Sequence, residues 1–222
     1  MKEVIDEALG SYLKGRVGSD MARKGKMADV DTYKRGIKTI IKFKEDFDNI
    51  GYPKIPRKLI GELGELYVLS KLRELGAKKM TPKGGQAGYD IYLEDSGKKI
   101  EVRTSLPKNE GTYPEQIRFF GWRVKNRNQK EDHKFDIMIG VGVDEAFKKP
   151  QFYIFTYDEA FSVGDVEIGR FGNVQKKIHL FQNEKMCKEA IKSCPHFVTK
   201  GERYINRHPL KFKDRWDKVF EI

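Results

Sequence analysis

The side chains best suited to chemistry lie in two short segments, 89–93 and 100–104. Asp90 lies in the first segment and Glu101 in the second, and branched apolar residues alternate with polar ones around both. This alternation is the period-two pattern of half-buried strands. Two carboxylates on neighbouring strands repel each other unless a cation lies between them, and Mg2+ prefers carboxylate oxygen. The pattern therefore favours a divalent metal site.

A turn joins the two segments into a predicted β-hairpin. If the turn is centred on residues 96–97, Asp90 lies opposite Arg103 and Tyr92 lies opposite Glu101. All four side chains then share one face of the hairpin. A one-residue bulge would shift this pairing but would keep the four side chains near one another.

These residues resemble the signature of the PD-(D/E)XK nuclease family, which is an acid, a short gap and then acid-x-lysine. Asp90 matches the first acid, Glu101 matches the second, and Arg103 stands where the family has lysine. Upstream, residues 64–68 (Gly-Glu-Leu-Tyr-Val) resemble the first helix of the family, which often carries an additional metal-site glutamate. The resemblance implies an α/β fold with a restriction-endonuclease-like central mixed β-sheet flanked by helices. Helical N- and C-terminal additions would complete this chain.

The resemblance also implies a role for each matching residue. Asp90, Glu101 and the carbonyl of Val102 would hold one or two Mg2+ ions, with Mn2+ as a substitute, and Glu65 would complete the shell through water. Water would be the nucleophile, so no covalent intermediate is needed. Arg103 would orient groups and offset charge, because a guanidinium cannot plausibly accept a proton.

Arg103 leaves the activity of such a site open. Its planar fork could instead pair with Asp90 or Glu101, which would give a nuclease fold that binds DNA without cutting it. Lys99 lies on the same alternating face, one pair nearer the turn, and is a candidate substitute for the missing lysine.

Residues 57–75 have the pattern of an amphipathic helix that packs on the sheet. Its apolar positions are Leu59, Ile60, Leu63, Leu66, Tyr67 and Leu72. Gly61 and Gly64 lower helix propensity, and we expect both to allow a close approach of the helix to a strand. Glu65 lies at the edge of the buried face, where it is either a metal-site ligand or a solvated side chain, and Glu62 is the alternative acid.

The charge balance indicates a polyanionic partner. The chain holds 44 lysines and arginines against 33 acids, a net charge of +11. Residues 1–58 carry 14 bases and 9 acids, and residues 183–222 carry 10 and 6. An excess in the terminal parts suits flanking elements that grip DNA phosphates, and solvated helix faces are the plainer alternative.

Basic and aromatic residues are interleaved around the predicted strand 117–124. By alternation Phe120, Trp122 and Val124 share one face, and we expect an aromatic row here to be buried. The glycine-rich segment 83–88 lacks the ending of a phosphate-binding loop, so no nucleotide cofactor is expected. The predicted nucleic-acid-binding residues are Lys83, Gln86, Ser105, Lys108, Arg123, Lys125 and Arg127.

Composition divides the chain into a basic helical region 1–56, a nuclease-like core 57–182 and a basic helical region 183–222. Further strands are expected at 135–143 and 151–156, and a further helix at 183–192. The residues that could bind zinc have a spacing that fits no common zinc module, so free thiols are expected. They are Cys187, Cys194, His196 and His208. With no apolar run of spanning length, a cytoplasmic or nucleoid-associated protein without membrane contact is expected.

The sequence therefore predicts a Mg2+-dependent endonuclease of restriction type that hydrolyses phosphodiester bonds of duplex DNA. A homodimer would let two sites cut two strands. The alternatives are a silent DNA-binding protein of nuclease fold, a structure-selective nuclease of DNA repair or junctions, and an RNA-binding or ribosome-associated basic protein. The last explains neither the convergence of the acids nor Glu65.

Overall fold

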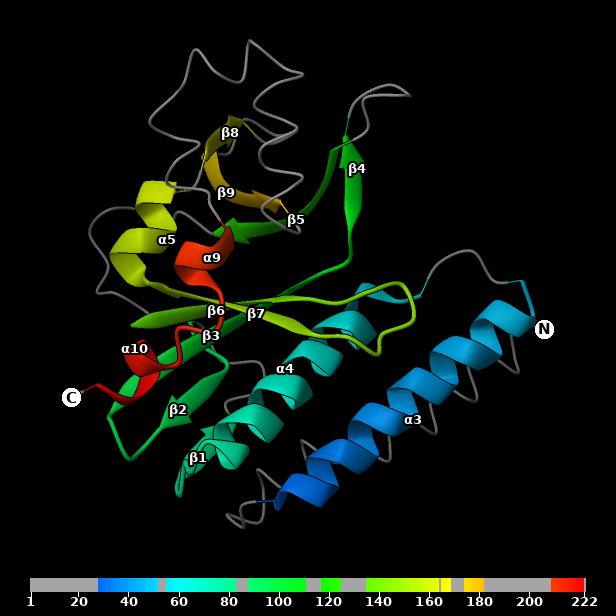
Figure 1. The fold of residues 1–222 in the computed structure, drawn as a ribbon, viewed down its shortest axis with the longest axis horizontal. Coiled ribbons are helices and arrows are strands. Elements are labelled where there is room, and N and C mark those ends of the chain that lie inside the picture. Colours follow the sequence, from blue (N-terminus) through cyan, green and yellow to red (C-terminus); the bar gives the residue numbers. More distant parts are fainter. Residues whose placement is uncertain are drawn as a thin grey trace.

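The computed structural model describes most of the central part of the chain. The described residues are 28–51, 55–82, 88–110, 117–124, 135–163, 165–168, 174–181 and 209–221, and some residues within 108–124, 165–181 and 209–210 are described by their backbone alone. Two helices, a five-stranded sheet and a four-stranded sheet lie one after another (Figure 1).

The five-stranded sheet is mixed. Its strands run in the order β1 (Met80–Pro82), β2 (Ile91–Leu93), β3 (Lys98–Ser105), β6 (Ile137–Gly142) and β7 (Gln151–Thr156). β3 and β6 are parallel, and the other neighbouring strands are antiparallel. The expected fold class, a central mixed β-sheet flanked by helices, is confirmed.

The four-stranded sheet is antiparallel and was only partly expected. Its order is β4 (Lys108–Glu110), β5 (Ile117–Val124), β9 (Val174–Phe181) and β8 (Asp165–Ile168). β4 follows β3 after two residues, so the chain passes directly from the first sheet into the second.

The aromatic row of β5 fills the space between the two sheets, as the alternation predicts. Phe120, Trp122 and Val124 are at most 3% exposed. Gly142 of β6 permits this contact, because a Cβ there would lie 2.5 Å from the ring of Phe120. These aromatic side chains are core residues and leave no stacking surface for nucleic acid.

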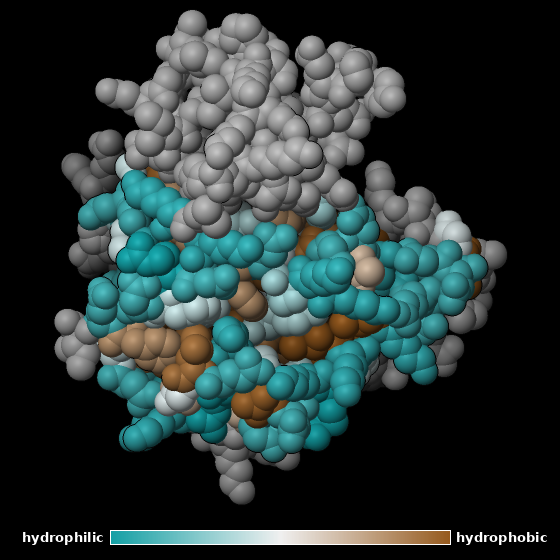
Figure 2. Space-filling model, viewed as in Figure 1, coloured by the Kyte–Doolittle hydropathy of each residue, from teal (hydrophilic) through white to brown (hydrophobic). Residues whose placement is uncertain are grey.

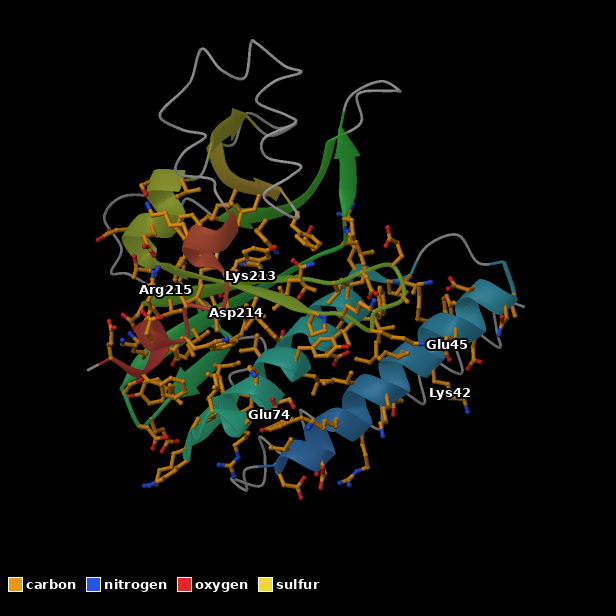
Figure 3. The ribbon with its side chains drawn as sticks, viewed as in Figure 1. Lys42, Glu45, Glu74, Lys213, Asp214 and Arg215 are labelled. Carbon is orange, nitrogen blue, oxygen red and sulfur yellow. The ribbon has the colours of Figure 1, made fainter. Side chains whose placement is uncertain are left out.

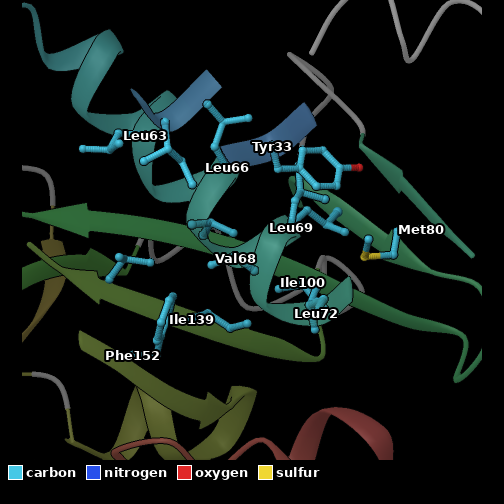
Figure 4. Packing of buried hydrophobic residues seen from close by; sticks show 14 of the residues in the cluster. Tyr33, Leu63, Leu66, Val68, Leu69, Leu72, Met80, Ile100, Ile139 and Phe152 are labelled. Atoms are coloured by element: carbon cyan, nitrogen blue, oxygen red, sulfur yellow. The ribbon is translucent and has the colours of Figure 1, made fainter. Parts of the chain in front are cut away.

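Two helices cover the other face of the five-stranded sheet. α3 (Val30–Asn49) begins after Asp29, whose carboxylate accepts a hydrogen bond of 2.7 Å from the Thr32 N–H and so caps the helix. α4 (Arg57–Glu74) begins after Pro56 and matches the predicted helix within one residue. Figure 4 shows leucines of α4 between the sheet and Tyr33 of α3. The apolar face predicted for α4 is confirmed as core.

The two glycines of α4 have different roles. A Cβ on Gly64 would lie 1.8 Å from the hydroxyl oxygen of Thr104, so only glycine lets α4 lie this close to β3. A Cβ on Gly61 would meet no atom within 4 Å. The expectation of close approach is therefore confirmed for Gly64 and wrong for Gly61, which faces open space.

Three shorter helices complete the described chain: α5 (Tyr157–Val163), α9 (Pro209–Phe212) and α10 (Asp217–Phe220). The predicted helix 183–192 lies outside the described residues. Among the described helices, none combines the length and the apolar character that a membrane crossing requires. The face in Figure 2 is mostly hydrophilic, with smaller hydrophobic patches between.

Candidate functional site

The acidic hairpin forms, but with a different register from the predicted one. Ile91 pairs with Ile100, and Tyr92 pairs with Lys99 rather than with Glu101. β2 ends at Leu93 and β3 begins at Lys98, so the turn has four residues, 94–97. The centre of the turn lies one residue earlier than predicted, and each residue of β2 therefore pairs with a residue of β3 two positions earlier than predicted. Since a shift of two preserves the faces of a strand, Asp90 and Glu101 still share a face. They lie closer to direct opposition than the sequence predicted.

Asp90 is held at the start of β2 by the backbone of β3. Its N–H donates to the carbonyl of Ile100 at 2.9 Å, and its Oδ2 accepts a hydrogen bond of 2.7 Å from the N–H of Val102. Burial raises the pKa of Asp90 above its ordinary value, while the Val102 hydrogen bond and the nearby Arg103 oppose that rise. The carboxylate is thus fixed in place in a partly desolvated site.

Among the described residues, Glu101 is the one charged residue that the fold buries, at 8% exposure. Its carboxylate pairs with the guanidinium of Arg103, two residues along the same face of β3. The side chain of Arg103 is 37% exposed, so this ion pair joins a buried acid to a base that reaches solvent. Of the two partners the sequence left open for Arg103, Glu101 is the one that forms the ion pair.

Glu65 of α4 brings a third carboxylate to the hairpin. Burial, together with the charges of Asp90, Glu62 and Glu101, raises its pKa to about 7, while Arg103 opposes the rise. Glu65 follows Gly64, where α4 packs against Thr104 of β3, the strand that carries Glu101. Glu62, the alternative acid, lies three residues earlier on α4, and its charge also raises the pKa of Glu65.

The carboxyl group of Glu65 is the one at this site whose pKa is raised to about 7, so near neutral pH it lies between its protonated and ionised forms.

The donor set has the chemistry that a divalent cation requires. The charges of Asp90, Glu62 and Glu101 raise the pKa of Glu65, and repulsion between carboxylates is the condition that a hard cation relieves. Within the described ranges, however, no group of three or more histidine, cysteine, aspartate or glutamate side chains is arranged as a ready metal site. In the structure the carboxylate of Glu101 pairs with Arg103, and Oδ2 of Asp90 accepts a hydrogen bond from the Val102 N–H.

One further residue near the site carried little signal in the sequence. The hydroxyl oxygen of Thr104 is buried against Gly64, and no described residue forms a hydrogen bond with it. Lys99, the candidate substitute for the missing lysine, has its ammonium 6.0 Å from the centre of the Tyr89 ring. Thr104 follows the motif residues directly on β3, which is the one feature that could have identified it.

The predicted nucleic-acid-binding residues fall into three groups. Ser105 is buried, and its hydroxyl joins β3 to β5 by accepting from the Gly121 N–H at 3.2 Å and donating to the Leu106 carbonyl at 2.9 Å. Lys108 lies in β4 and Arg123 in β5, where only their backbone is described. The residues outside the described ranges are Lys83, Gln86, Lys125 and Arg127, together with Cys187, Cys194, His196 and His208. Ser105 therefore connects the sheets and is not exposed to a ligand.

Comparisons with known proteins add a resemblance of fold. No family model matches the sequence. The comparison with curated proteins gives no match either. The structure is similar to that of a bacterial homing endonuclease, I-Ssp6803I, with a TM-score of 0.45 and 19% sequence identity over 75% of this chain and 93% of that one. A likeness of this size assigns no residue and no activity, which depend on the geometry of the site.

Proposed function

We propose that this chain is a metal-dependent endonuclease that hydrolyses phosphodiester bonds of duplex DNA. The burial of Glu65 beside the hairpin that carries Asp90 and Glu101 supports this proposal, because burial first, and the charges of the neighbouring acids second, raise the pKa of Glu65 to about 7. Perturbed carboxylates that share a partly buried site are typical of catalytic centres. An incidental pair of surface acids would show no such coupling.

A divalent cation fits this donor set. Asp90 and Glu101 would hold Mg2+ or Mn2+, with the Val102 carbonyl and Glu65 as further ligands, directly or through water. When bound, the ion would lower the pKa of a water molecule and offset negative charge on the phosphate.

The remaining steps depend on the side chains themselves. If Glu65 reaches the ion only through water, its carboxylate is placed to accept a proton from that water, and burial already moves its pKa towards neutral pH. Arg103 carries a fork of donors that matches a phosphate, and its side chain reaches solvent. When it releases Glu101 to bind phosphate, the released acid becomes free for the cation. One movement of Arg103 would thus serve both substrate and metal.

The substrate and assembly are inferred from charge and symmetry. A net charge of +11 suits DNA as the partner. Restriction-type cleavage cuts both strands of the DNA duplex and requires two active sites, so we propose a homodimer.

The test is cleavage of plasmid, linear and branched DNA with Mg2+ or Mn2+ by the parent chain and by Glu101→Ala. We expect the parent to cut duplex DNA and Glu101→Ala to lose at least about 100-fold in rate, as for the loss of a group that stabilises charge in the transition state. Glu94→Ala is the matched control, because Glu94 is an exposed acid at the far end of the same hairpin, bonded to the Thr81 hydroxyl. Cleavage that persists in Glu101→Ala would contradict the assignment of Glu101 to the active site.

A second candidate function is supported by the ion pair between Arg103 and Glu101. If that pair stays closed, the chain binds DNA through a nuclease fold without cutting it. Arg103→Lys distinguishes the two, because lysine is a flexible point charge that cannot form the same fork. Cutting by Arg103→Lys but not by the parent would indicate a silenced nuclease. DNA binding without cutting by either protein would indicate a binding module.

A further inference from the structure

The turn end of the acidic hairpin is tied to a distant part of the chain. We call residues 209–221 the strap. Lys98, the first residue of β3, donates from its ammonium to the carbonyl of Lys218 at 2.8 Å and to the carbonyl of Glu221. The hydroxyl of Ser96, in the turn, donates to the carbonyl of Val219 at 3.3 Å. The hairpin and the strap therefore share three hydrogen bonds.

The bonds have a clear physical basis at the end of helix α10. This helix has only four residues, and the last carbonyls of a helix have no partner within it. A lysine ammonium at a helix C-terminus satisfies such carbonyls and complements the helix dipole. Lys98 thus acts as the cap of α10, although it lies 120 residues away from Lys218 in the sequence.

The strap is itself firmly anchored to the sheet. The N–H of Asp214 donates to the carbonyl of Phe152 on β7 at 3.0 Å, and Lys213 forms a β-bridge with Tyr153. Figure 3 shows Lys213, Asp214 and Arg215 on the strand-like stretch between α9 and α10. Trp216 packs edge-on against Phe152, with 5.2 Å between the ring centres. The strap can therefore hold the turn of the hairpin at a fixed position relative to β7.

A partly buried ion pair adds a second anchor. The ammonium of Lys218 donates to Oε2 of Glu159 on α5 at 2.6 Å. Burial opposes ionisation of Glu159, yet the bonds from Lys218 and from the Thr156 N–H hold its pKa below the ordinary value. The same residue, Lys218, offers its carbonyl to Lys98 and its ammonium to Glu159. It links α5 to the hairpin directly.

The hairpin needs such support because β2 and its neighbour β1 are short strands. β1 and β2 have three residues each, and β1 lies at the edge of the sheet. A strand with so few ladder bonds opens easily. Asp90 takes its position from the Val102 N–H, so any loosening of β2 against β3 moves this carboxylate relative to Glu101.

We propose that the strap positions the acidic hairpin, and that Lys98 is a positioning residue for Asp90 and Glu101. Its ammonium joins the turn to α10, and α10 is held by β7 and α5. The effect on catalysis rests on the proposed function, whereas the effect on the hairpin does not.

The experiment compares the full chain with Lys98→Met, which keeps the apolar stem and removes the ammonium. Hydrogen exchange at the Val102 amide reports the hairpin without any reference to activity. We expect this amide to exchange about tenfold faster in Lys98→Met, as for the loss of a charged hydrogen bond, with exchange in α4 unchanged. We also expect a kcat on duplex DNA lowered by about fivefold with an unchanged KM, since binding of substrate is not affected.

Two variants control this result. Lys79→Met removes an exposed lysine at the same end of the sheet and should leave both readouts at the parent values. Lys98→Arg restores a cation and should recover most of the protection of Val102. If Lys98→Met proves too unstable, Ser96→Ala removes only the bond to Val219 and should give a smaller change in the same direction.

The outcomes separate the two proposals. Unchanged exchange at Val102 in Lys98→Met, or faster exchange spread evenly over the whole sheet, overturns the positioning role. Faster local exchange in Lys98→Met, together with no DNA cleavage by the parent chain, supports the positioning role of the strap and contradicts the proposed nuclease function. Faster local exchange with an unchanged kcat limits the strap to stability and overturns its role in the site.

Discussion

The two ends of the acidic hairpin treat charge in opposite ways. At the site end, Asp90 and Glu101 share a partly buried space with Glu65, and the pKa of Glu65 rises to about 7 through burial and repulsion. At the turn end, Lys98 meets backbone carbonyls and Lys218 meets a carboxylate. The site end brings acids near one another, whereas the turn end pairs the ammonium groups of Lys98 and Lys218 with acceptors.

The difference teaches how a small sheet can hold an unfavourable site. Like charges that lie together away from water destabilise the fold. Such an arrangement persists only where the contacts of the surrounding structure hold the charged residues in place. Here Gly64 brings α4 close to the site from one side, and the strap fixes the turn from the other. The comparison predicts effects of opposite sign when charges are removed at the two ends.

Removal of the Glu65 charge should have the largest effect and should stabilise the protein. The native state holds a proton on Glu65 up to about pH 7, whereas the unfolded chain loses it near the ordinary value of 4.5. Stability therefore falls as the pH rises from about 4.5 to 7. Glu65→Gln should raise the free energy of unfolding by up to about 3 kcal/mol at pH 8 and leave it unchanged at pH 4. Urea titrations at both pH values measure this, and equal shifts at the two would contradict it.

Removal of the Lys218 charge should destabilise the protein by about 2 kcal/mol, because it leaves Glu159 partly buried without its partner. The sign with pH is opposite to that of Glu65. The pKa of Glu159 is held below its ordinary value, so this contribution is present above the unfolded pKa and is lost as the pH falls through the folded one. Thermal unfolding of Lys218→Met at pH 8 and at pH 3 tests this. Lys213→Met, on the same strap, should match the parent.

The glycines of α4 give the next effect and a matched pair. Gly64→Ala should cost about 1 to 2 kcal/mol, because its Cβ would meet the Thr104 hydroxyl at 1.8 Å. Gly61→Ala should stabilise the helix by about 0.5 to 1 kcal/mol, since its Cβ meets nothing. Denaturant unfolding of both variants is the measurement. A second change, Thr104→Ala, should recover part of the loss in Gly64→Ala, and a loss of equal size without any such recovery would argue against the close contact.

The smallest effect is expected far from both ends of the hairpin. Lys34 on α3 and Glu74 on α4 form an exposed ion pair at 2.9 Å. Lys34→Ala should change the free energy of unfolding by less than about 0.5 kcal/mol, because exposed pairs are screened by water and salt. A larger change in the free energy of unfolding would mean that exposed ion pairs also contribute to stability, so that large effects of charge are not confined to the hairpin.

Much of the fold and part of the site could be predicted from the sequence. Leu63 and Leu72 recur at helical spacing, and that spacing located α4 to within one residue. Alternation identified the strand of Phe120 and Trp122 and the shared face of the two hairpin acids, because side chains in a strand alternate whatever the strand pairs with. The second sheet as a whole was not predicted, since β8 and β9 are defined by pairing with distant strands.

The identities of Asp90, Glu101 and Arg103 and the faces of the strands were determined by the sequence alone, because they follow from residue type and local periodicity. Tertiary structure decided the rest: the two-position shift of the hairpin, the partner of Arg103, and which glycine of α4 touches a strand. It also decided that the ammonium of Lys98 caps α10. Each of these depends on the distance between segments far apart in the chain, and no local pattern of residues encodes that distance.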